Sequence, residues 1–154
     1  LHRAIIGPRD KTERKTIQAW VLGTKAPGTR ITADLTVRPG GLFNQQDGSL
    51  PAWVGIELMA QSIAAYAGCQ ARQAGLPVEL GFLLGTRKFE CNVERFPAGA
   101  ELRIRALRSL QDDNGMGVFE CHLDGPDIHA EARLNVFRPP EVARYLQEQQ
   151  EQTQ

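Results

Sequence analysis

The sequence has no surplus of charge and no long apolar run. Its 18 Lys and Arg residues balance its 18 Asp and Glu residues, so the formal net charge is zero. Proteins that bind nucleic acids or anionic membranes need a basic surplus, and a membrane-spanning helix needs about 18 consecutive apolar residues. The apolar part of LHRAIIGPRDKTERK, residues 1–15, is too short for a secretory signal. We therefore expect a cytoplasmic protein that binds neither nucleic acid nor membrane.

Cysteine is scarce as well. The three residues, Cys69, Cys91 and Cys121, are odd in number and widely separated, which excludes a complete disulfide framework and a CxxC redox or metal pair. His122 and His129 fall on the polar phase of two alternating segments, a pattern typical of solvated strand histidines. Because His, Cys, Asp and Glu residues do not recur at the spacing of metal ligands, we expect no metal site.

The chain does contain enough apolar residues for one core. Hydrophobic residues make up 42% of its 154 residues, and this length is typical of a single domain. Residues 1–30 have mixed charge and are interrupted by glycines and a proline, so they form a poorly readable segment with at most one short element. We place the domain at residues 31–140. Residues 141–154, which end in a polar run, are interpreted as a helix that continues into a disordered tail.

Two hydrophobic periods define the predicted elements. Alternation from Ile31 to Val37 predicts a half-buried strand. Between Pro51 and Ala74 apolar residues recur every three or four positions and Gly75 follows, which predicts one long helix. Further alternating strands are predicted at residues 81–91, 101–106, 116–123 and 128–137, with a turn at 113–115. This order predicts an α+β protein in which an antiparallel sheet wraps one long central helix. Because such a sheet leaves an edge strand, we expect a dimer.

The predicted helix is unusually rich in small residues. Small side chains let a helix backbone come close to whatever it packs on. Ala64 and Gly68 lie on successive turns, and we expect both to face the sheet.

Glu57 is the candidate for chemistry on this helix. Its sequence neighbours are Ile56, Leu58 and Met59, and carboxylates in apolar surroundings are rare unless they are paired or functional. Gln61 follows four residues later on the same helix face, close enough to hydrogen-bond the carboxyl group. Two interpretations remain: an exposed first-turn Glu favoured by the helix dipole, or a functional carboxylate.

The motif P-x5-E-x-M-A-Q, from Pro51 to Gln61, resembles the helix start of hotdog-fold (3R)-hydroxyacyl-[acyl carrier protein] dehydratases. The stretches GFLLGTRKFECNVERFPAGAELRIRA and HAEARLNVFRP are similar to the later strands of that family. The resemblance covers about residues 30–139 and is greatest to the dehydratase-like proteins of aryl polyene clusters. It implies a hotdog fold, Glu57 as the catalytic carboxylate, and an acyl carrier protein as partner. The family uses no cofactor apart from the carrier protein's phosphopantetheine, which holds the substrate.

One departure from the family concerns the base. The family has a His fourteen residues before the Glu, in a loop, which removes the α-proton of the thioester. Phe43 occupies that position here, and no His occurs between His2 and His122. The family's His and Glu come from opposite protomers, so the resemblance implies either a homodimer or a heterodimer in which a His-bearing hotdog paralogue completes the site.

Dehydration also needs donors for the thioester oxygen. The first turn of a helix has unpaired N–H groups and the positive end of the dipole, so we assign substrate binding to Ala52, Trp53 and Val54, and to Gln61. Arg87 and Lys88 are interpreted as surface charges, with contact to a carrier protein as the alternative.

Three functions stay open at this point. The first is a dehydratase subunit that works on carrier-bound acyl chains and uses Glu57 as an acid. The second is a hotdog thioesterase in which Glu57 activates water or attacks the carbonyl. The third is a non-catalytic partner subunit.

Overall fold

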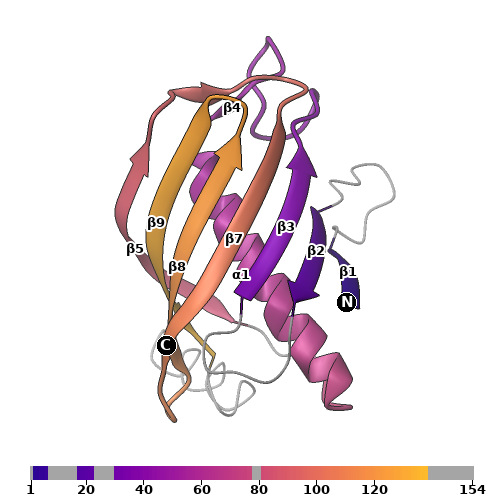
Figure 1. Cartoon of the computed structure of the whole chain (residues 1–154), viewed down its shortest axis with the longest axis vertical. Helices are drawn as coiled ribbons and strands as arrows, with labels where there is room; N and C mark the ends of the chain where they lie inside the picture. Colours follow the sequence, from indigo (N-terminus) through magenta and orange to yellow (C-terminus); the bar gives the residue numbers. More distant parts are fainter. Residues whose placement is uncertain (1, 7–16, 23–29, 78–80, 139–154) are drawn as a thin grey trace, which may run out of the picture.

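The computed structural model describes residues 2–6, 17–22, 30–77 and 81–138 (Figure 1). It contains one long helix and a seven-stranded antiparallel sheet with the order β1-β2-β3-β7-β8-β9-β5. The elements are β1 (His2–Ile6), β2 (Ile17–Leu22), β3 (Arg30–Thr36), β4 (Leu50–Pro51), α1 (Val54–Gln73), β5 (Phe82–Cys91), β6 (Arg95–Phe96), β7 (Glu101–Gln111), β8 (Met116–Gly125) and β9 (Ile128–Phe137). The predicted α+β class is confirmed.

The sheet has one buried face because its strands alternate. On β8, residues 117, 119, 121 and 123 are buried, and on β9 residues 128, 130, 132 and 134 are buried. Successive side chains of a strand point to opposite faces, so the remaining residues of these two strands form the outer face of the sheet. Figure 1 shows α1 lying across the other face, where the core is.

The predicted turn at 113–115 joins β7 to β8. The carboxylate of Asp112 accepts hydrogen bonds from the backbone N–H groups of Asn114 and Met116. Gly115 has a φ of 94°, and a Cβ there would lie 2.0 Å from the carbonyl oxygen of Arg138. A residue with a side chain does not fit at this position, which explains the glycine.

The helix packs on the sheet mainly through Val54, Leu58, Met59 and Ile63, all at most 8% exposed. A Cβ added at Gly55 would already touch the ring of Phe96 at 3.4 Å. The close approach that small residues predict therefore occurs at the start of the helix.

The prediction for Ala64 is wrong. Ala64 is exposed and Gly68 is half-buried, whereas the next residue, Ala65, is 1% exposed and belongs to the core. Small and apolar residues occupy both sides of this helix, so composition alone could not decide which side faces the sheet. Glu57 and Ala64, seven residues apart, lie together on the open side.

The sheet extends into the N-terminal segment. Strands β1 and β2 pair with each other and β2 pairs with β3, so residues 1–30 supply two strands instead of the single short element that the sequence suggests. The predicted tail at 141–154 lies outside the described residues.

Within the described residues, β5 forms one end of the sheet, because it pairs only with β9. Leu83 and Leu84 on this edge strand are 42% and 55% exposed. Two exposed leucines on an edge strand are the kind of surface that a second strand would cover.

Candidate active site at the start of the helix

The start of α1 is held against β6. The N–H of Ala52 donates to the carbonyl of Glu94 at 3.0 Å, so Ala52 is not the unpaired donor that we expected. The N–H groups of Gly55 and Ile56 donate to the carbonyls of Ala52 and Trp53 in a tight first turn. For the N–H groups of Trp53 and Val54, no acceptor is found in the described part of the chain. These two groups are thus the available donors at the positive end of the helix.

Glu57 lies one turn further along and points away from the core. It is exposed, whereas its neighbours Leu58 and Met59 are buried. The Nε2 of Gln61 donates to Oε1 of Glu57 at 2.9 Å, as the four-residue spacing predicts. The apolar sequence around Glu57 therefore belongs to the core-facing side of the helix and does not enclose the carboxylate in this chain.

The loop at residues 39–49 also lies beside the start of α1. Its conformation is held by side chains: Asn44 Nδ2 donates to the carbonyl of Gly48 at 2.7 Å, and the Ser49 N–H donates to the Asp47 carboxylate at 3.0 Å. Hydrogen bonds from Ser49, and to a smaller extent the nearby Arg95, lower the pKa of Asp47. The loop brings Phe43, at the position of the family's His, into edge-on contact with Trp53 at a centroid distance of 5.6 Å.

The described histidines lie on the other side of the sheet from this arrangement. His122 on β8 and His129 on β9 belong to the outer face of the sheet, opposite the face that carries α1. Among the residues whose side chains the structure describes, no histidine lies on the helix side of the sheet. The helix start therefore offers a carboxylate and two N–H donors, and the described residues of this chain add no histidine base.

The two residues interpreted as surface charges, with carrier-protein contact as the alternative, lie on β5. Arg87 and Lys88 are exposed, and Lys88 has a positive φ of 55° at an irregularity in the pairing of β5 with β9. Both charged side chains are open to solvent. Among the described residues, no hydrogen bond or ion pair connects them to the start of α1.

One long helix packed on an antiparallel sheet defines a hotdog-fold protein. The family model of the ApeP-like proteins, described as ApeP dehydratase, matches residues 24–147. The chain therefore belongs to the ApeP-like dehydratase family, and the resemblance to the aryl polyene dehydratase-like proteins is confirmed. No curated protein matches the sequence.

Solved structures agree with this assignment. The dehydratase heterocomplex ApeI:P from Xenorhabdus doucetiae matches with 33% identity and a TM-score of 0.67 over 73% of this chain and 77% of that chain. A mutant of the fluoroacetyl-CoA-specific thioesterase FlK matches with 10% identity and a TM-score of 0.61, over 85% and 99% of the two chains. Zebrafish thioesterase superfamily member 2 matches with 14% identity and a TM-score of 0.53, over 79% and 80%. The last two show the fold alone.

Helix α1 is not apolar enough to span a membrane, and it is the one long helix among the described residues.

Proposed function

We propose that this chain is one subunit of a composite dehydratase that removes water from 3-hydroxyacyl chains held as thioesters on a carrier protein. A His-bearing hotdog paralogue supplies the base. The observation that carries the proposal is the composition of the helix start: Glu57 is presented outward, and Phe43 stands where the family has its His. The similar ApeI:P protein is a dehydratase heterocomplex, and this supports the two-subunit arrangement.

The chemistry divides between the subunits. The partner's His takes the proton from C2 of the acyl chain, and the carboxyl group of Glu57 gives a proton to the C3 hydroxyl, which leaves as water while the C2–C3 double bond forms. The N–H groups of Trp53 and Val54 donate to the thioester oxygen as negative charge develops there. Gln61 holds the carboxyl group of Glu57 in position through their 2.9 Å hydrogen bond.

The exposed residues on α1 and β5 support the binding of a partner subunit over Glu57. The face of α1 that carries Glu57 also carries exposed Ala64, which leaves room for an acyl chain or another helix. The exposed Leu83 and Leu84 on edge strand β5 provide an apolar strip that a second hotdog sheet would bury. A covering subunit would exclude water from the surroundings of Glu57.

The test compares the chain alone with the chain co-expressed with its His-bearing paralogue. The substrate is a 3-hydroxyacyl carrier-protein thioester, and the readout is the absorbance of the new double bond together with the mass of the acyl group. We expect little turnover by the chain alone, because a general base contributes roughly 10²–10⁴-fold, and full turnover by the complex. Glu57→Gln should abolish turnover of the complex. Glu120→Gln, an exposed position on the outer face of β8, is the matched control and should retain it.

Two other outcomes would overturn the proposal. Full activity of the complex with Glu57→Gln would mean that this chain is a non-catalytic partner. Release of free acid by the chain alone, lost in Glu57→Gln, would identify a thioesterase instead.

A further inference from the structure

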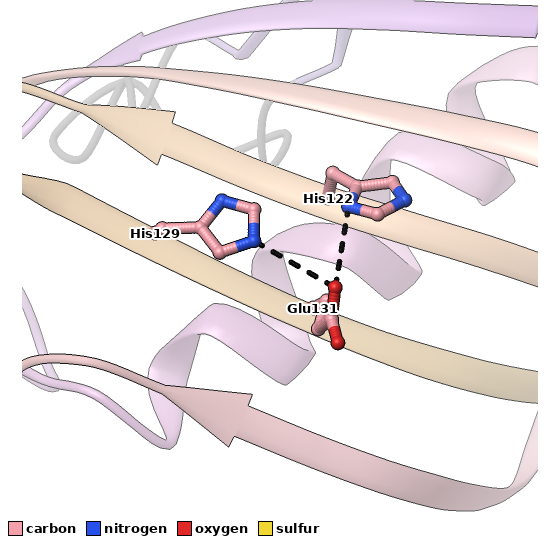
Figure 2. A group of neighbouring side chains, drawn as sticks. All are labelled: His122, His129 and Glu131. Atoms are coloured by element: carbon pink, nitrogen blue, oxygen red, sulfur yellow. Dashed lines mark ion pairs between the residues drawn. The ribbon is translucent and has the colours of Figure 1, made fainter.

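The hairpin of β8 and β9 gathers titratable side chains on the outer face of the sheet. In the pairing of these strands His122 lies opposite Glu131, and Asp124 lies opposite His129. All four alternate with buried residues that face the helix. Figure 2 shows His122, His129 and Glu131 directed toward one another from the two adjacent strands.

The distances in this cluster are short enough for one small ligand. Oε2 of Glu131 lies 3.8 Å from Nδ1 of His122 and 3.6 Å from Nε2 of His129. The three candidate ligand atoms all lie within 4.8 Å of one another. In a tetrahedral zinc site with bonds of about 2.0–2.1 Å, ligand atoms are separated by about 3.3–3.5 Å. His122 is half-buried and the other two residues are exposed, so side-chain rotation can bring the three atoms closer together.

A second observation concerns the orientation of His129. Its Nδ1 lies 2.7 Å from Oδ1 of Asp124, and the other carboxylate oxygen of Asp124 accepts a hydrogen bond from Arg105 at 2.7 Å. Because Asp124 is an acceptor, Nδ1 carries the proton in the neutral imidazole, and the lone pair is on Nε2, the atom beside Glu131. A carboxylate that orients a histidine in this way is a regular feature of protein metal sites.

We propose that His122, His129 and Glu131 bind a divalent transition-metal ion of the zinc type, with water in the remaining position. Two imidazole nitrogens and one carboxylate oxygen are a ligand set that Zn²⁺ accepts. Asp124 is the positioning residue for His129. The ion links β8 to β9 on the face of the sheet away from Glu57, so the site is separate from the dehydratase site and does not depend on the proposed function.

The probe is Zn²⁺ titrated into the full chain without an affinity tag, with affinity and stoichiometry measured by calorimetry. We expect one ion per chain. His122→Asn, His129→Asn and Glu131→Gln should each weaken binding by at least about tenfold, and Asp124→Asn by about 10–100-fold, the range seen for groups that orient a metal ligand. His2→Gln removes the remaining histidine of the chain and should leave the affinity unchanged, as should Glu120→Gln.

The spectrum of the Co²⁺ form checks the ligands. We expect nitrogen and oxygen coordination without a thiolate charge-transfer band, because none of the three proposed ligands is a cysteine. Circular dichroism of each metal-free variant confirms that the fold is retained. Binding that is unaffected by Glu131→Gln and His129→Asn, a thiolate band, or no binding below about millimolar Zn²⁺ would overturn the proposal and leave the cluster as a set of histidine–carboxylate ion pairs.

Discussion

The ring of Phe43 stands edge-on against the indole of Trp53, with ring planes at 81° and centroids 5.6 Å apart. This contact ties the loop at 39–49 to the first turn of α1. The loop is itself braced by the hydrogen bonds of Asn44 and Ser49. Position 43 therefore lies beside the helix start.

Replacing Phe43 by His should give the chain a base of its own. If the variant forms a homodimer, each site has the Glu57 of one subunit and the introduced His of the other. We expect the variant alone to dehydrate 3-hydroxyacyl thioesters at least about tenfold faster than the parent chain, a small part of what a well-placed base contributes. Phe43→Asn, which is polar but not basic, is the control. An inactive His variant beside an active heterocomplex would show that position 43 does not place a base at the substrate.

Gln61 should matter through the orientation of Glu57. Removing its hydrogen bond in Gln61→Leu should lower kcat of the heterocomplex by roughly threefold to tenfold, because one hydrogen bond contributes about 0.5–1.5 kcal/mol. Gln61→Glu tests the donor specifically, since a carboxylate of nearly the same shape cannot donate when ionised. Steady-state kinetics should show the change in kcat more than in KM. A change in KM alone would mean that Gln61 contacts substrate and does not position Glu57.

Two neighbouring alanines test the placement of the helix. Ala65→Leu introduces bulk at a position that is 1% exposed and should lower the free energy of unfolding by about 1–3 kcal/mol. Ala64→Leu, one residue earlier and exposed, should change it by less than about 0.5 kcal/mol. Urea unfolding of the chain alone measures both. In the proposed heterocomplex, Ala64→Leu should weaken assembly instead, which gel filtration with the paralogue would detect. Equal losses of stability would mean that the helix is rotated from the position described.

Cys121 should make stability depend on pH in alkaline solution. Burial, with a smaller contribution from the charge of Glu120, raises the pKa of the Cys121 thiol from 9.0 to about 12. The folded state thus keeps the proton that the unfolded state gives up. This contribution to stability is fully present below pH 9.0 and is lost as the pH rises toward about 12, by up to about 1.4 kcal/mol per pH unit.

Urea midpoints at about pH 8 and about pH 10, compared between the parent chain and Cys121→Ala, isolate this effect from other titrating groups. The variant should be less stable at the lower pH because of the cavity, and its stability should fall less between the two. Parallel pH profiles would show that the thiol is not desolvated. In the native chain, half-buried Cys91 should react with an alkylating reagent before Cys121 does.

Local patterns in the sequence were sufficient for much of the fold. The helix predicted between Pro51 and Ala74 is α1 at Val54–Gln73, and the strands from residue 81 onward match β5, β7, β8 and β9. Periods of 3.6 and 2 residues are properties of the chain itself, and Asn114 and Gly115 suit a turn by their own backbone preferences. The hydrogen bond between Glu57 and Gln61 follows from the same helical geometry.

Strand pairing and helix orientation were decided by tertiary structure. Residues 122 and 131 become neighbours only because the turn at Pro126 and Asp127 pairs Gly125 with Ile128. Asp127 in this turn has a φ of 56°, a backbone conformation that Asp tolerates. A turn predicted there from the sequence could have revealed the cluster of His122, His129 and Glu131. Glu57 faces outward and Ala65 inward because the sheet packs on one of two similarly apolar sides of the helix, and burial of large side chains such as Met59 selects that side. Composition states which residues a helix contains, and only tertiary packing decides which of them are exposed to solvent.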